Sequence, residues 1–246
     1  RGLHDASEGR IENTAPAFEA ALAAGHGIEC DLRPAAGGWP IVFHDATLER
    51  LVDPPSSGGT PHAVSALSPG DLSRLRYRAS PATAILSFAD LLDIVGGHVP
   101  LLVEIKSEWT PPDADFLGLI ASLAGRYRGP LALMSFDPAV MAAVAALAPR
   151  LMRGIVSGLY RRGDGEGWWD DKLSVERQER LSHLLESGPA RPDFYAYHVK
   201  ALPTPVTRYV REVEGTPVFT WTVRSPEDWH IVRTHADAAI FEGAVP

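Results

Sequence analysis

A regular alternation between short apolar runs and helical segments constrains the fold of this chain more than any other feature. The apolar runs are four to seven residues long and predict strands. Most segments between them have helical spacing, and several open with helix-start residues, as at Asp113, Asp137 and Ser225. Strands and helices that alternate in this way are typical of a parallel sheet, closed or open.

The predicted elements cover most of the chain. We predict strands over residues 27–33, 40–44, 101–106, 131–136, 152–157, 193–198, 217–223 and 238–241. We predict helices over residues 16–24, 88–95, 113–126, 138–147, 176–186, 205–212 and 226–235. Turn-forming and charged residues predict loops over residues 53–61 and 161–172.

The second apolar run lies too close to the first for a helical crossover. His44 follows Asp31 by only 13 positions, and the segment between them turns through residues 35–38. A parallel crossover usually takes a dozen or more residues and carries a helix, so we predict an antiparallel hairpin here. Seven parallel strands then remain. Because the helix at 16–24 has no strand before it, we expect an eighth strand upstream of Arg1, in a longer protein.

Length and composition fit a single domain over residues 1–246, because one α/β barrel takes about 250 residues. A hydrophobic fraction of 45% excludes disorder as the main state, and a single cysteine excludes a disulfide framework. No apolar run approaches the ~20 residues of a membrane helix, so we expect no stable membrane insertion. The net charge of −8 argues against a nucleic-acid partner. The start shows no signal-peptide pattern, and we expect a cytoplasmic protein.

Two acidic residues interrupt the first apolar run. Glu29 and Asp31 lie on one face of the predicted strand, and Cys30 points to the opposite face as a core thiol. Two carboxylates in an apolar setting repel each other and lose hydration, so a cation, a basic side chain or protonation must compensate them. Carboxylate oxygens suit hard cations such as Mg²⁺ or Ca²⁺. The alternative is a strand end that lies in solvent.

A second pair of charged residues lies in the aliphatic strand at 101–106. A parallel strand buried on both faces is expected to be continuously apolar, and Glu104 and Lys106 break that rule. An internal ion pair would explain them. Alternatively, Glu104 provides a third carboxylate for one metal ion, together with Glu29 and Asp31.

Two further segments carry candidate site residues. His44 ends the return strand of the hairpin beside Glu29 and Asp31, and imidazole is suited to proton transfer near neutral pH. A half-exposed histidine with no special role is the alternative. Arg1 offers fork-shaped donors for a phosphate. Glu12 precedes Asn13 and Thr14, either of which we expect to cap the helix that follows.

Seven ordered motifs together resemble the glycerophosphodiester phosphodiesterase family. They are Arg1-Gly2, Glu12-Asn13-Thr14-x-x-x-Phe18, Glu29-x-Asp31, Val42-Phe43-His44-Asp45-x-x-Leu48-x-Arg50, Glu104-x-Lys106, Ser135-Phe136 and Trp221-Thr222-Val223. The match is dense in the first fifty residues and sparse between Met152 and Thr216.

The resemblance implies a (β/α)8 TIM barrel that hydrolyses glycerophosphodiesters to glycerol 3-phosphate and an alcohol, within glycerol and lipid metabolism. It implies one divalent metal ion, Mg²⁺ or Ca²⁺, held by Glu29, Asp31 and Glu104. His44 would be one of two acid/base histidines. Arg1 and Lys106 would hold the phosphate and serve catalysis, Glu12 would orient the groups around them, and Trp221 would line the glycerol side.

The sequence departs from the family pattern at its first residue. The family opens with His-Arg-Gly, whereas this chain starts at Arg1, so we expect the other histidine in the upstream segment. Two alternatives stay open: a lysophospholipase D-like hydrolase, and a barrel that binds phosphodiesters without turnover. We expect Trp168 and Trp169 to fold back on the barrel rim, and stacking on a choline-like group is the alternative.

Overall fold

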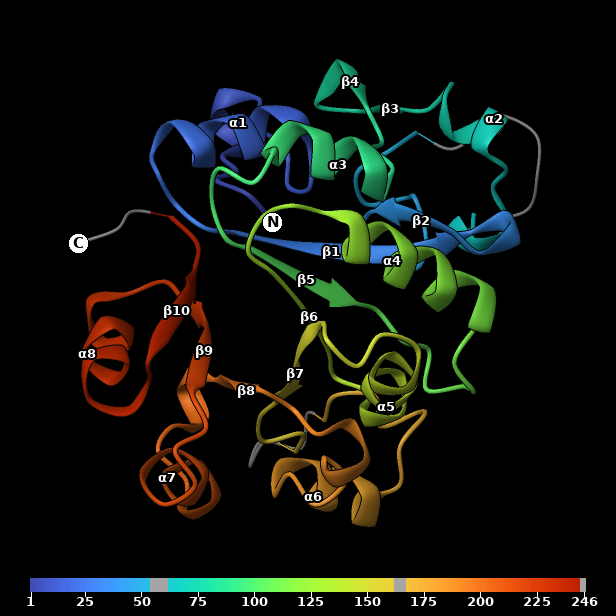
Figure 1. The fold of residues 1–246 in the computed structure, drawn as a ribbon. Coiled ribbons are helices and arrows are strands. Elements are labelled where there is room, and N and C mark those ends of the chain that lie inside the picture. The colour runs from blue at the N-terminus through green and yellow to red at the C-terminus, as the bar shows by residue number, and fades with distance from the viewer. Residues whose placement is uncertain (54–61, 162–166, 244–246) are drawn as a thin grey trace. The chain divides into compact units, whose positions relative to one another are not determined.

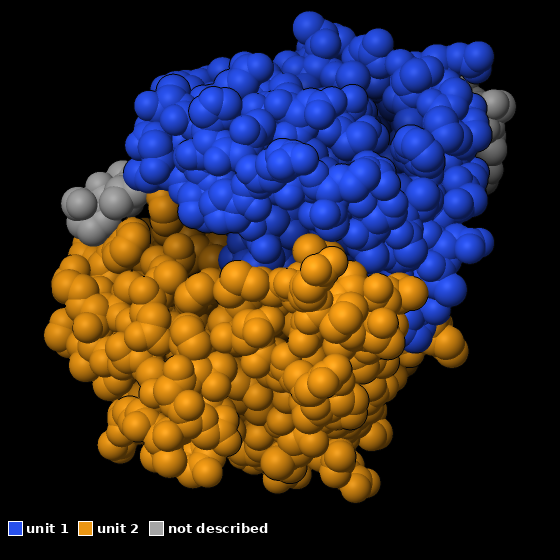
Figure 2. All heavy atoms as spheres, viewed as in Figure 1, with its two compact units in different colours: residues 1–106, 112–133 blue, residues 107–111, 134–246 orange. Residues whose placement is uncertain are grey.

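The computed structural model describes residues 1–53, 62–161 and 167–243. Its contacts divide the chain into two compact units (Figure 2). Unit 1 comprises residues 1–106 and 112–133, and unit 2 comprises residues 107–111 and 134–246. Strand β6 (Leu131–Ser135) crosses the boundary between them.

Unit 1 combines a short sheet with the helices that pack on it (Figure 1). Its strands are β1 (Ile28–Ala35), β2 (Trp39–Val42), β3 (Arg76–Tyr77), β4 (Ser80–Ala84) and β5 (Leu101–Ile105). Its helices are α1 (Ala15–Ala23), α2 (Pro69–Leu72), α3 (Phe88–Val95) and α4 (Ala114–Arg126).

Strand β1 holds the sheet of unit 1 together. It pairs antiparallel with β2, with Leu32 opposite Val42, and parallel with β5, with Asp31 opposite Glu104. The β1–β2 hairpin confirms the short-connection argument. Its turn requires glycine at Gly38, where φ is +72° and a Cβ would lie 2.9 Å from the backbone nitrogen of Phe116.

The helices of unit 1 bury one face, and residues typical of helix ends mark where α3 begins and ends. Helix α3 begins with a capping box between Ser87 and Asp90 and ends at Gly96 in the left-handed region. Helix α1 packs against α3 (Figure 1), and Phe18 and Phe88 are fully buried. Helix α3 also packs on β2, the hairpin partner of β1.

Unit 2 repeats the strand–helix alternation. Its strands are β7 (Met152–Ser157), β8 (Phe194–His198), β9 (Val218–Val223) and β10 (Ala238–Phe241). Its helices are α5 (Pro138–Leu147), α6 (Val175–Ser182), α7 (Pro205–Glu212) and α8 (Pro226–His235). Parallel pairing joins β7 to β8, β8 to β9 and β9 to β10, and α7 and α8 pack on β9 (Figure 1).

Each predicted strand and helix overlaps an observed one, with one notable difference in length. The helix predicted over 176–186 ends at Ser182, because Leu184 has a φ of +58° and cannot continue a right-handed helix. Helix α2 and the β3–β4 hairpin were not predicted. Residues 54–61 of the first predicted loop and 162–166 of the second lie outside the described residues. Residues 168–172 of the second form turns, as predicted. Within the described residues, no helix is both long and apolar enough to cross a membrane.

The buried face of α1 provides a test of this packing. We expect Phe18→Ala to lower the free energy of unfolding by about 3–5 kcal/mol, because it leaves a cavity where a fully buried ring stood. Urea unfolding followed by circular dichroism measures the change. Glu19→Ala, at the exposed neighbouring position, is the control and is expected to change stability by less than about 0.5 kcal/mol. Equal stabilities for the two variants would show that α1 is packed differently.

Candidate active site

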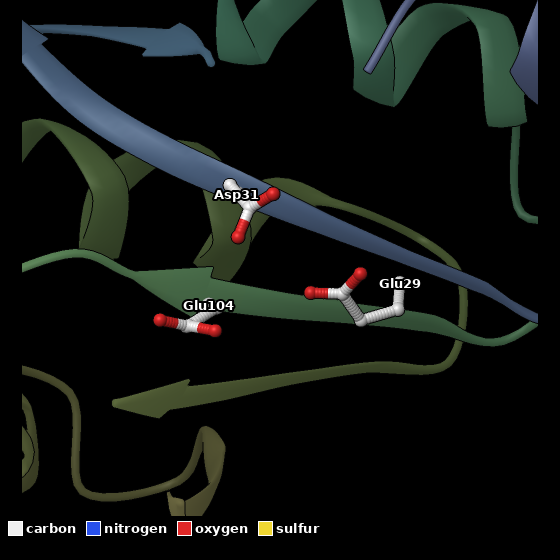
Figure 3. Close-up of side chains that lie close together, drawn as sticks. All are labelled: Glu29, Asp31 and Glu104. Carbon is white, nitrogen blue, oxygen red and sulfur yellow. The ribbon is translucent and has the colours of Figure 1, made fainter. Parts of the chain in front are cut away.

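Three carboxylates from two adjacent strands converge in unit 1 (Figure 3). Glu29 and Asp31 project from β1, and Glu104 projects from β5 directly opposite Asp31. One oxygen from each lies within 4.8 Å of the others. Asp31 is 1% exposed and Glu104 is 8% exposed, while Glu29 is half-buried. Side chains two positions apart on a strand share a face, so parallel pairing of β1 with β5 is enough to bring the three together.

Burial of three like charges is unfavourable, and the raised pKa of Glu104 is a consequence of it. Its pKa is raised, first by burial and then by the negative charges of Asp31 and Glu29, against the opposing influence of Lys106. Three ionised carboxylates at this buried position are therefore unfavourable unless positive charge compensates them.

Lys106 places a positive charge in direct contact with two of the carboxylates. Its Nζ lies 2.8 Å from Asp31 Oδ1 and 2.7 Å from Glu104 Oε1. Burial alone would lower the pKa of Lys106, but the two carboxylates outweigh it and raise the pKa above its usual value. The internal ion pair that the sequence suggested at 104 and 106 is thus present, and it extends to Asp31.

Arg1 approaches the same carboxylates from the chain start. Its Nε lies 3.3 Å from Asp31 Oδ2, and its Nη1 donates to Glu12 Oε1 at 3.1 Å. The Gly2 amide donates to the carbonyl of Glu29 at 3.1 Å and keeps this segment beside β1. Gly2 has a φ of +72°, and a Cβ there would meet the Ala17 backbone at 2.9 Å, so the close approach depends on glycine.

Asn13 is a site residue to which the sequence analysis assigned a different role. Its Nδ2 donates to Asp31 Oδ2 at 2.8 Å, and its Oδ1 accepts from the Asp31 amide at 3.2 Å. Of the two residues considered as caps of α1, Thr14 occupies the N-cap position, but its hydroxyl donates to the carbonyl of Ile11 and no side-chain hydrogen bond caps the helix. Asn13 has a φ of +59°, a conformation asparagine tolerates well, and this fits its clamp on Asp31.

The pKa of Asp31 follows from these contacts. Burial would raise it, but the positive charges of Lys106, His44 and Arg1 together hold it far below its usual value. Asp31 is therefore a fixed, buried carboxylate anion between two basic side chains.

His44 lies two residues beyond β2, in the segment that follows the hairpin. The amide of Phe43 donates to the carbonyl of Asp31 at 3.0 Å, and Arg33 Nε donates to the carbonyl of His44 at 2.7 Å. His44 Nδ1 lies 2.7 Å from Asp45 Oδ1. The hairpin thus brings the imidazole to the carboxylate-bearing strand, and Asp45 fixes its Nδ1 side.

The donor set fits a hard divalent cation. It consists of three carboxylate oxygens, each from a side chain held by backbone pairing or by hydrogen bonds, and oxygen ligands are what Mg²⁺ and Ca²⁺ prefer. The raised pKa of Glu104 agrees with this, because a cation would relieve the repulsion that raises it. Glu29, Asp31 and Glu104 are thus residues that could hold one metal ion.

Trp221 lies in unit 2, within an aromatic cluster. Its ring centroid is 4.8 Å from that of His198, 5.2 Å from that of Phe136 and 5.4 Å from that of Trp168, and its Nε1 donates to the Ala196 carbonyl at 3.0 Å. Trp168 and Trp169 both pack into this cluster, consistent with the fold-back that the sequence analysis expected. The glycerol-lining role of Trp221 stays a prediction.

Comparisons with known proteins agree with this architecture. The model of the glycerophosphoryl diester phosphodiesterase family matches residues 1–241. Among curated proteins no match is found. A phosphodiesterase from Oleispira antarctica, solved in complex with the product sn-glycerol-3-phosphate, is 18% identical, with a TM-score of 0.72 over 98% of this chain and 91% of that one. A glycerophosphodiester phosphodiesterase from Parabacteroides distasonis is 19% identical, with a TM-score of 0.71 over 98% of this chain and 90% of that one. These likenesses confirm the predicted fold class, a (β/α)8 TIM barrel.

The ion pairs of Lys106 lead to a stability prediction. We expect Lys106→Met to lower the free energy of unfolding by about 3–5 kcal/mol in the presence of a chelator, because it removes the ammonium group that contacts two buried carboxylates. Urea unfolding measures the difference. Lys200→Met is the control: Lys200 pairs with Asp228 but is 63% exposed, and its loss is expected to cost less than about 1 kcal/mol. A Lys106→Met variant as stable as the parent would contradict the ion-pair assignment.

Proposed function

Because the chain belongs to the glycerophosphoryl diester phosphodiesterase family, we propose that it hydrolyses glycerophosphodiesters with one divalent cation and releases glycerol 3-phosphate and an alcohol. Membership of this family makes the protein a phosphoric diester hydrolase. The observation that carries the metal-dependent form of the proposal is the convergence of Glu29, Asp31 and Glu104 in one buried cluster. The family match extends through both compact units, which supports residues 1–246 acting as one catalytic domain.

Glu29, Asp31 and Glu104 would hold the cation, either Mg²⁺ or Ca²⁺. When bound, such an ion supplies positive charge that offsets the charge on the phosphoryl oxygens and makes phosphorus more electrophilic. The protein's part is to keep the three carboxylates in place. Asn13 and the pairing of β1 with β5 do this for Asp31 and Glu104.

Arg1 and Lys106 would bind the phosphodiester anion. An ammonium group has three N–H donors, and the contacts of Lys106 with Asp31 and Glu104 account for two of them. The third would be donated to a phosphoryl oxygen. The Arg1 guanidinium would add charge-assisted hydrogen bonds, and its link to Glu12 limits how far it can swing.

His44 would transfer the proton. It would either accept one from the nucleophile, which is water or the glycerol 2-hydroxyl, or donate one to the leaving alkoxide. Because Nδ1 is held by the Asp45 carboxylate, Nε2 is the ring nitrogen that would transfer the proton. For Trp221 we propose contact with the glycerol moiety, on the strength of the family resemblance and of its half-buried ring.

A product-release assay tests the proposed function. The protein is incubated with several glycerophosphodiesters and with a lyso-glycerophospholipid, with and without a chelator. Released glycerol 3-phosphate and free alcohol are measured, and binding of the glycerophosphodiester is measured by calorimetry. Release that stops with chelator and returns with Mg²⁺ or Ca²⁺ supports the proposal. Release of a free alcohol from the lysolipid alone would favour a lysophospholipase D-like enzyme. Binding of a glycerophosphodiester without release would indicate a non-catalytic barrel.

The role of His44 predicts a kinetic effect. We expect His44→Ala to lower kcat by about 10²–10⁴-fold with an unchanged circular dichroism spectrum, because a general acid or base typically contributes this much. His62→Ala is the control, since His62 pairs with Glu49 and has no assigned role. Near-parental kcat in His44→Ala would remove this residue from the mechanism.

The ligand role of Glu29 predicts weaker metal binding. We expect Glu29→Gln to reduce affinity for Mg²⁺ and Ca²⁺ in calorimetry, because it removes one formal charge from an oxygen donor set. Glu19→Gln, on the exposed face of α1, controls for the general loss of one negative charge. Unchanged affinity in Glu29→Gln would show that the ion binds elsewhere.

A further inference from the structure

Arg50 contacts both Glu12 and Asp45, two acidic side chains beside the carboxylate cluster. Its Nη1 and Nη2 donate to Glu12 Oε2 and Oε1 at 2.9 and 2.7 Å, a two-pronged contact with one carboxylate. Its Nε donates to Asp45 Oδ2. Three N–H groups of one guanidinium thus hold two acidic side chains that lie 33 positions apart in the chain.

Both acidic partners lead onward to groups of the proposed mechanism. Glu12 Oε1 also accepts from Arg1 Nη1 at 3.1 Å. Asp45 uses its other oxygen, Oδ1, for His44 Nδ1 at 2.7 Å. A continuous chain of contacts therefore runs from Arg1 through Glu12, Arg50 and Asp45 to His44.

We propose that Arg50 is a positioning residue, which fixes the phosphate-binding arginine and the acid/base histidine relative to each other through Glu12 and Asp45. The inference rests on the proposed function, because it concerns the same reaction. It extends that function to a residue that has no contact with the carboxylate cluster. Arg50 acts on the reaction only through its two partners.

The surroundings of Arg50 suit this role. Glu12 is 11% exposed and Asp45 is 22% exposed, so both carboxylates are largely shielded from water beside Arg50. Burial would raise the pKa of Glu12, but Arg50 and Arg1 hold it below its usual value. Burial would likewise raise the pKa of Asp45, and His44 and Arg50 keep it low. Both groups stay ionised and available for their arginine and histidine contacts.

The backbone of Arg50 is held by contacts that do not involve its own side chain. The Arg78 guanidinium donates to the carbonyls of Glu49, Arg50 and Val52, and the Arg78 amide donates to the carbonyl of Leu51. Removal of the Arg50 side chain is therefore expected to leave this segment in place. A functional loss on truncation can then be assigned to the guanidinium.

Arginine is the residue type that this geometry needs. Its planar fork has five N–H donors, so it can hold one carboxylate with two bonds and a second with the remaining Nε. A lysine offers a single point of contact on a flexible stem. We expect Arg50→Lys to retain the charge and lose most of the positioning.

The test combines truncation with chemical rescue. We expect Arg50→Ala to lower kcat by roughly 10²-fold on a glycerophosphodiester, with a smaller change in KM, because misplaced catalytic groups affect turnover more than binding. Since the Arg50 side chain is 46% exposed, free guanidinium at a non-denaturing concentration can enter the gap and is expected to restore much of the lost kcat. Tetramethylammonium at the same concentration, which has no N–H donors, is expected to restore none.

Two controls complete the test. Arg180→Ala truncates an arginine of similar exposure, 49%, which pairs with Glu186 in unit 2, and it is expected to keep kcat within about threefold. In NMR spectra, the backbone amide signals of His44 and Asp45 are expected to shift in Arg50→Ala and to return with guanidinium, whether or not the protein turns over substrate.

The outcomes separate the two proposals. Absence of turnover in the parent protein contradicts the proposed function. With an active parent, the positioning role is wrong if Arg50→Ala keeps its kcat, if guanidinium restores neither kcat nor the amide signals, or if Arg180→Ala loses as much kcat as Arg50→Ala. The positioning role is supported if kcat falls in Arg50→Ala but not in the control variant, and if guanidinium restores it while tetramethylammonium does not.

Discussion

The electrostatic balance between three buried carboxylates and their basic neighbours is the constraint on which the site depends. One carboxylate oxygen of each of Glu29, Asp31 and Glu104 lies within 4.8 Å of the others. They meet because β1 pairs with β5 in a register that sets Asp31 opposite Glu104. In the low dielectric of a sheet interior, like charges this close are unfavourable unless a cation lies beside them. Lys106 and Arg1 supply part of that charge. A divalent cation would complete it.

Around this cluster, polar contacts fix the direction of each side chain. Asn13 holds both the carboxylate and the amide of Asp31. Asp45 holds the imidazole of His44, and Arg50 ties Asp45 to Glu12. Strand pairing therefore determines where the three carboxylates lie. The side chains of Arg1 and His44 are instead oriented by contacts with Glu12 and Asp45. Groups held in the second way are the more sensitive to loss of a single partner, because no backbone ladder supports them.

Much of the fold could be predicted from sequence, for identifiable reasons. Strands and helices could be predicted because apolar periodicity is local. The β1–β2 hairpin could be predicted because the six residues between the two predicted strands, 34–39, are too few for a helical crossover. The end of α6 was missed because the left-handed conformation of Leu184 has no signal in the residue type. The capping expectation at Asn13 failed because the side chain found a stronger, charged partner on β1.

The sequence by itself determined which residues share a face of a strand, and hence that Glu29 with Asp31, and Glu104 with Lys106, would present charge on the same side of buried strands. This follows from the two-residue period of the backbone, which any extended segment obeys. Only the tertiary structure decided that Asp31 stands opposite Glu104, that Asn13 clamps Asp31 and that Arg50 bridges Glu12 and Asp45. Strand register and the meeting of distant side chains depend on how whole elements pack, and no local pattern encodes them.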